Sequence, residues 1–172
     1  NDPQLWHDIL SWVSRTTSTF IRAQIMAGAS ALQLFDSWAG KLSLDDYVTF
    51  AAPHSKSVMD SLSDLPVPRV HFGTKTGAML TQMRDVGATV IGIDSDTPLD
   101  VANNILKGVV PLQGNIDPER LSGSWEDLKS HVTDVLKRGS LAPAHVVNLG
   151  HGVPPDTDPE LLTKMIAFIH GD

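Results

Sequence analysis

Cysteine is absent from the 172-residue sequence. Its absence excludes disulfide frameworks, zinc sites built on thiolates, and thiol nucleophiles. No apolar run reaches the roughly 18 residues that a membrane span needs, and the N-terminus has no basic segment followed by an apolar core. The sequence therefore predicts neither a membrane span nor a secretory signal, and we expect the protein in the cytoplasm.

Positive charge is also scarce. Lys and Arg number 13 against 20 Asp and Glu, which gives a net charge of −7 and argues against a generally basic surface for nucleic acid. With 41% hydrophobic and 19% charged residues, the composition is typical of a soluble globular protein with one sizeable core. No low-complexity segment or Gly/Ser linker interrupts it, so we expect residues 1–172 to form a single domain.

Short apolar runs alternate with helical patterns along the whole chain. The expected strands are Ala31–Phe35, Arg69–Phe72, Thr89–Ile93, Val109–Leu112 and Val146–Leu149. The expected helices cover about residues 3–27, 43–62 with a kink or break at Pro53, 78–86, 99–106, 125–137 and 159–169. This alternation predicts βα units and a parallel sheet buried on both faces, which is an α/β fold.

Polar residues recur just after the expected strands. They are Ser37, Thr74 with Lys75, Asp94, Gln113 with Asn115, and His151. In (β/α)8 barrels the carboxyl ends of the strands carry the active site, but an eight-stranded barrel needs about 250 residues. Five strands that direct polar loops to one rim therefore fit a sector of a barrel better than an open sheet.

Four segments carry a more specific resemblance. In order they are LQLFDSWAGKLSLDDY (32–47), VIGID (90–94), PLQGNIDP (111–118) and NLGHGVPPDTDPE (148–160). They resemble successive motifs of the uroporphyrinogen decarboxylase family, in the C-terminal half of its chain. The resemblance implies the C-terminal part, about five βα units, of a (β/α)8 TIM barrel. One departure is Ser95, where that family commonly has tryptophan.

The resemblance also implies an activity. The family are lyases of haem biosynthesis that remove the four acetate carboxyl groups of uroporphyrinogen III to give coproporphyrinogen III, without metal or organic cofactor. They are cytoplasmic and usually homodimeric. Their arginine cluster, the aspartate that holds the pyrrole NH groups and a cleft tyrosine belong to the N-terminal half of the family sequence. We therefore assign no catalytic residue here and expect the 172 residues alone to be inactive and poorly stable.

Three residues match substrate-facing positions of the family. Ser37 and His151 match residues that contact the substrate, and Phe35 matches an apolar residue that lines the cleft. Without the resemblance, a histidine between two glycines is more often a hydrogen-bonded loop residue, and Ser37 more often caps a turn. We expect Asp94, Gln113 and Asn115 to serve the local backbone structure instead.

Two alternative functions remain open at this stage. A zinc-dependent methyltransferase of the corrinoid or methionine-synthase type has a similar barrel, but it needs thiolate ligands that this sequence lacks. A non-catalytic half-barrel, which works only with a partner supplying the other half, is the second. Five parallel strands without closure leave open sheet edges, which proteins usually pair or cover. The other histidines show no H-E-x-x-H spacing and are expected on the surface or in the core.

Overall fold

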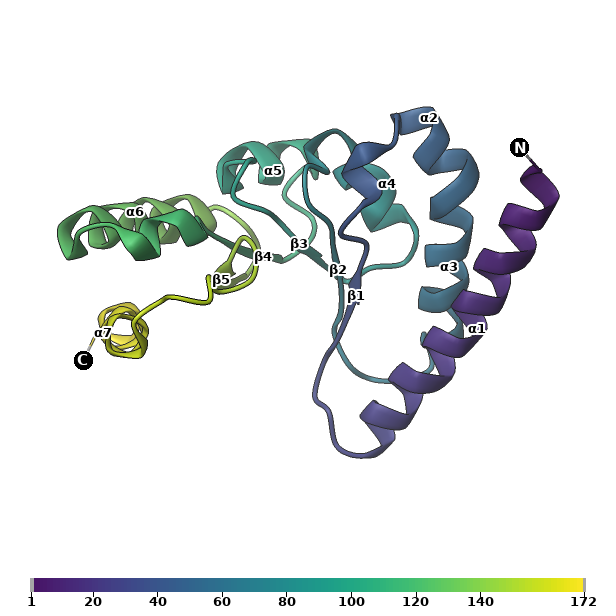
Figure 1. The fold of residues 1–172 in the computed structure, drawn as a ribbon, viewed down its shortest axis with the longest axis horizontal. Coiled ribbons are helices and arrows are strands. Elements are labelled where there is room, and N and C mark those ends of the chain that lie inside the picture. The colour runs from purple at the N-terminus through teal and green to yellow at the C-terminus, as the bar shows by residue number, and fades with distance from the viewer. Residues whose placement is uncertain (1, 172) are drawn as a thin grey trace. The chain divides into compact units, whose positions relative to one another are not determined.

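The computed structural model describes residues 2–171. Strands and helices alternate along these residues, and the strands follow the order β1-β2-β3-β4-β5 (Figure 1). The predicted α/β class with about five βα units is confirmed. The chain divides into two compact units, the first ending at Ile91 and the second beginning at Gly92. The prediction of a single domain stays a prediction.

The elements have the following bounds. The strands are β1 (Leu32–Phe35), β2 (Arg69–Phe72), β3 (Val90–Gly92), β4 (Leu112–Ile116) and β5 (His145–Leu149). The helices are α1 (Pro3–Met26), α2 (Leu44–Asp46), α3 (Ala52–Ser61), α4 (Leu80–Asp85), α5 (Leu99–Ile105), α6 (Trp125–Gly139) and α7 (Pro159–His170).

The long helix α1 begins and ends where local chemistry requires it. The Asp2 carboxylate accepts hydrogen bonds from the backbone N–H groups of Gln4 and Leu5, and Pro3 occupies the first turn, where its missing N–H costs nothing. The chain turns at Gly28, whose φ is +110°. Helix α1 packs against α3 beside β1 (Figure 1).

The first unit pairs β1 with β2 in parallel, with Leu34 opposite His71 and Phe35 opposite Phe72. Successive side chains of a strand point to opposite faces, so Leu34, Asp36 and His71 share one face. The predicted break in the second helix is confirmed, because a π-helical turn (Tyr47–Ala51) separates α2 from α3, whose second residue is Pro53.

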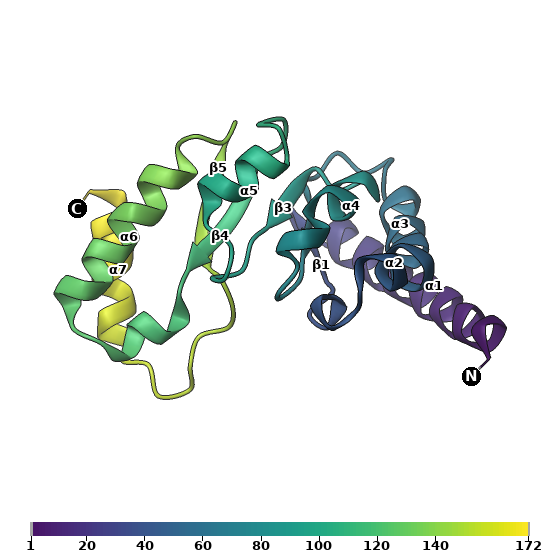
Figure 2. The ribbon, with the colours of Figure 1, turned by 90° about the horizontal axis from the view of Figure 1, so that it is seen from above.

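The second unit pairs β4 with β5 in parallel, with Asn115 opposite Asn148. The Ser124 hydroxyl caps α6, which buries Leu128, Val132 and Val135. Helix α7 starts on the Asp158 carboxylate cap and packs alongside α6 (Figure 2).

The fourth strand lies further along the chain than predicted. The sequence places it at Val109–Leu112, whereas β4 begins only at Leu112 and includes Gln113 and Asn115. Pro111 has no N–H to donate to a sheet ladder, and Val109 is 66% exposed, so the apolar run before Leu112 leads into the strand without pairing. Gln113 and Asn115 are therefore strand residues, and the prediction that they follow a strand is wrong.

The half-buried His131 on α6 gives the second unit a pH dependence. Its Nε2 accepts the backbone N–H of Asp117 at 2.9 Å, which requires a neutral ring, and burial together with Arg120 lowers the pKa of His131 below the ordinary value of 6.5. As the pH falls below about 6.5, the unfolded chain takes up a proton before the folded chain does, so the unfolding free energy decreases. His131→Gln keeps an acceptor that does not titrate.

We expect His131→Gln to reduce the loss of stability between about pH 6.5 and 5, measured by urea unfolding at each pH. The exposed His170 provides the matched control, since His170→Gln makes the same change at the surface of α7. If the unfolding free energy of His131→Gln depends on pH as steeply as that of the parent, His131 does not cause the loss of stability.

Candidate functional site

Phe35 and Ser37 lie at the carboxyl end of β1 in the first unit. The Phe35 side chain is 67% exposed and meets the ring of Phe72 edge-on, with the ring centroids 6.0 Å apart. Ser37 is half-buried and lies two residues later, in the turn that follows the strand. These two predicted residues thus share the end of one strand and offer an exposed ring beside a hydroxyl.

The loop that carries Ser37 packs tightly on the loop after β2. The Thr74 hydroxyl donates to the Ser37 carbonyl at 2.6 Å, and the N–H of Asp36 donates to the Phe72 carbonyl at 2.7 Å. A Cβ atom at Gly40 would collide with the carbonyl oxygen of Thr74, so only glycine permits this approach. The positions of both loops are therefore tied to each other, and the second of them presents Lys75 at the surface.

A polar cluster that the sequence did not reveal lies behind the Ser37 loop. The Asp36 carboxylate Oδ2 lies 3.4 Å from the Ser55 hydroxyl and 3.6 Å from Nε2 of His71, whose side chain is fully buried. The Tyr47 hydroxyl is buried too, and burial together with the Asp36 charge raises the pKa of Tyr47. The one sequence signal was a histidine inside the apolar strand β2.

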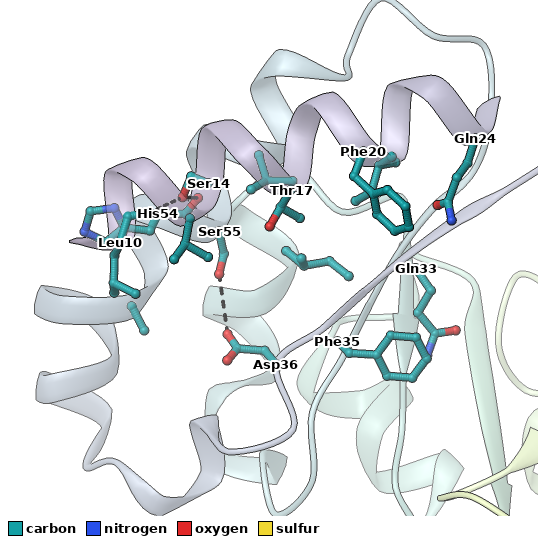
Figure 3. Close-up of a pocket in the computed structure, with 15 residues that line it drawn as sticks. Leu10, Ser14, Thr17, Phe20, Gln24, Gln33, Phe35, Asp36, His54 and Ser55 are labelled. Carbon is teal, nitrogen blue, oxygen red and sulfur yellow. Dashed lines mark hydrogen bonds between the residues drawn. The ribbon is translucent and has the colours of Figure 1, made fainter. Parts of the chain in front are cut away.

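A groove of about 490 Å³ runs between α1, α3 and β1 of the first unit (Figure 3). Its walls are mostly apolar, with Phe20 and Phe35 among them, and Asp36, His54 and Ser55 supply polar groups at one end. Figure 3 shows Asp36 directed toward Ser55 of α3. Ser37 is not among the lining residues, so the groove and the Ser37 loop are separate features of this unit.

His151 lies in the second unit, directly after β5, and its side chain is exposed. The preceding Gly150 packs against the backbone after β3, where a Cβ atom would meet the N of Ser95 and the carbonyl carbon of Asp94. A Cβ at Gly152 would meet nothing within 4 Å. The two glycines that flank the imidazole therefore have different roles.

Asn115 also binds the backbone of the loop that follows β3. Its amide Nδ2 donates to the carbonyl oxygens of Asp94, at 2.8 Å, and Thr97, at 2.7 Å. The prediction that Asn115 bonds neighbouring backbone is confirmed. Asp94 is buried as well. The loop after β3 is therefore held by Asn115, and Gly150, which comes directly before His151, packs against it.

The contrast between the two glycines predicts unequal effects of the same substitution. Gly150→Ala forces the added methyl into backbone atoms that cannot rotate away, and we expect it to lower the unfolding free energy by about 1–3 kcal/mol. Gly152→Ala should change it by less than about 0.5 kcal/mol. Urea unfolding of both variants measures the difference, and equal effects would mean that the close approach at Gly150 is not rigid.

The structure thus brings Phe35 and Ser37 together in the first unit and places His151 in the second. Their roles toward a substrate stay predictions. Of the histidines expected to be structural, His71 is fully buried, and the Nε2 of His145 donates to the Gly114 carbonyl oxygen. Residues 2–171 contain no group of three or more His, Asp or Glu side chains that could hold a metal ion. Among the same residues, no helix is long and apolar enough to span a bilayer.

Comparison with known proteins places the chain in a family. The model of the uroporphyrinogen decarboxylase (URO-D) family matches residues 1–171. A uroporphyrinogen decarboxylase from Arthrobacter sp. (strain FB24) is 54% identical over 98% of this chain and 49% of its own length. Its counterpart from Salinispora tropica is 48% identical over 98% of this chain and 46% of its own length. The chain spans about half the length of the curated relatives it matches.

A solved structure, a methyltransferase from Methanosarcina mazei, superposes with a TM-score of 0.77 over 90% of this chain and 45% of its own. At 18% sequence identity this likeness concerns the fold alone. It agrees with the predicted partial barrel, since less than half of the longer protein is matched by nearly all of this one. The segments quoted from the sequence and the match over residues 1–171 lead to one conclusion: this chain belongs to the uroporphyrinogen decarboxylase family.

Proposed function

We propose that this chain forms the C-terminal half of a decarboxylase that converts uroporphyrinogen III to coproporphyrinogen III, as the curated relatives are named to act on uroporphyrinogen. The observation that carries the proposal is 54% identity to such a relative across 98% of the chain. The proposed enzyme needs no cofactor, acts in the cytoplasm and forms a homodimer.

The chemistry divides between two parts of the enzyme. Protonation of a pyrrole ring creates an electron sink, and the carbon–carbon bond to the acetate carboxyl group then breaks with release of carbon dioxide. The ring carries positive charge during this step, which a carboxylate stabilises, while the peripheral carboxylates of the substrate are suited to arginine forks. We assign both tasks to the half of the family sequence that this chain does not match.

The residues of this chain then bind and orient the substrate. The exposed imidazole of His151 donates a hydrogen bond to a substrate carboxylate, and the Ser37 hydroxyl does the same. Phe35 offers an exposed apolar ring to the macrocycle, and Lys75 at the neighbouring loop brings a positive charge toward its acidic side chains. Each role supports binding more than it supports the bond-breaking step.

The test is a fusion polypeptide that joins the N-terminal half of the Arthrobacter relative to residues 1–172. We expect the purified fusion to produce coproporphyrinogen from uroporphyrinogen, measured by chromatography of the oxidised porphyrins. The complete Arthrobacter protein provides the positive control. A folded fusion that leaves uroporphyrinogen unchanged would contradict the proposed function.

A further inference from the structure

The buried histidine of β2 has two ring nitrogens in different situations. Its Nδ1 lies 3.1 Å from the Met83 carbonyl oxygen, near the C-terminal end of α4, where helix carbonyls lack intrahelical partners. A carbonyl only accepts, so this nitrogen must carry a proton. The Nε2 atom is buried without a hydrogen-bond partner and lies 3.6 Å from Oδ2 of Asp36.

The geometry at Nε2 indicates which protonation states of the imidazole and the carboxylate give an attractive contact. A neutral ring protonated at Nδ1 would turn a lone pair at Nε2 toward a carboxylate oxygen, and two acceptors repel each other. The contact becomes attractive when one proton lies between them, with the imidazolium of His71 beside the carboxylate of Asp36. The carboxylate is only 25% exposed, so water weakens this attraction less than at the surface.

Asp36 transmits the effect of His71 to the candidate site. It is the residue before Ser37, and its carbonyl accepts the Ala39 N–H at 3.0 Å, which starts the tight turn after β1. Its side chain points to the face shared with His71, whereas Phe35 belongs to the opposite face of the strand. Anchoring the carboxylate therefore fixes the direction in which the next residue presents its hydroxyl.

We propose that His71 is a positioning residue that holds Asp36 by a buried ion pair and thereby orients Ser37 toward the substrate. The proposal rests on the proposed function, because His71 acts on the same substrate-binding residue, Ser37, through the contact with Asp36. His71 does not touch the substrate, and Tyr47 and Ser55 complete the polar surroundings of the carboxylate.

Two conservative variants separate the two ring nitrogens. The amide of asparagine reaches the position of Nδ1, so His71→Asn keeps a donor to the Met83 carbonyl and removes the group that faces Asp36. The amide of glutamine reaches the position of Nε2, so His71→Gln keeps a donor to Asp36 and removes the contact with Met83. A role in anchoring Asp36 and a role in tying β2 to α4 thus predict opposite results.

The first experiment measures amide hydrogen exchange of the loop in the 172-residue chain, so it does not require an active enzyme. Amide hydrogen exchange of Ala39, Lys41 and Leu42, which are hydrogen-bonded within the turn, should be roughly tenfold faster in His71→Asn, the size expected for losing a bond to a charged group. It should stay near the parent rate in His71→Gln. Faster exchange in the glutamine variant alone, or equal rates in both variants, would overturn the proposal.

The second experiment measures kinetics in the fusion with the Arthrobacter half. We expect His71→Asn to raise the KM for uroporphyrinogen by roughly tenfold with a smaller change in kcat, and His71→Gln to restore most of the loss. Asp36→Asn combined with His71→Asn should cost no more than either change alone. Additive losses would contradict the shared role. If the fusion is inactive while the exchange pattern holds, the proposed function fails and the positioning role stands.

Discussion

Replacing His151 by alanine is expected to lower the kcat/KM of the active fusion by roughly 10–100-fold, which corresponds to about 1.5–3 kcal/mol for a hydrogen bond to a charged group. The physical reason is the proposed hydrogen bond from the exposed imidazole, which follows β5, to a substrate carboxylate. His151→Asn should impair turnover as well, because the amide of asparagine does not reach the position of the imidazole Nε2. Steady-state kinetics with uroporphyrinogen measure both effects.

The same substitution should leave the fold unchanged, because an exposed loop residue contributes little to the core. Thermal unfolding of His151→Ala should therefore match that of the parent protein. His170→Ala is the matched control, since it also removes an exposed histidine but lies at the C-terminal end of α7. Unchanged kinetics for His151→Ala would mean that His151 does not bind the substrate and is a structural loop residue.

The 172-residue chain by itself is expected to show no turnover of uroporphyrinogen and low stability. The resemblance implies that the family's arginines and its aspartate lie in sequence that the chain does not match, so we expect charge recognition and ring protonation both to be missing. Apolar side chains that a closed barrel would cover are exposed, with Phe35 at 67% and Val146 at 51%. We expect its turnover of uroporphyrinogen to lie below the detection limit of the assay.

The experiment compares three samples at equal concentration. These are the chain alone, the N-terminal half of the Arthrobacter relative alone, and the two halves mixed or fused. Activity only in the third sample fits the account, and a rise in unfolding midpoint on mixing would show that the halves stabilise each other. Turnover by the chain alone at the rate of the complete relative would show that its own residues supply the chemistry.

Much of the fold was predictable because local signals agree with tertiary structure. The bounds of β2 match the prediction, since the run ends at Gly73, and α1 starts at its Asp2 cap. The strand β4 was misplaced because an apolar run containing Pro111 looks like a strand in sequence but cannot pair as one. Hydrophobicity alone does not report a missing N–H group.

The candidate site was predictable only in part. Phe35, Ser37 and His151 were found by their motifs, and each lies at the carboxyl end of a strand. The contact between Asp36 and His71 was not foreseen, because it depends on the register that sets Leu34 opposite His71, and register between distant strands is a tertiary property. The partner of His151 is expected on the substrate, so no pattern within the chain could identify it.

The most direct test of the central claim is the carbon dioxide released per uroporphyrinogen consumed by the fusion of the Arthrobacter half with this chain, followed with the mass of the porphyrin product. We expect the loss of the four acetate carboxyl groups, with the propionate groups retained and coproporphyrinogen as the end product. A folded fusion that releases no carbon dioxide, or that yields a product other than coproporphyrinogen, would contradict it.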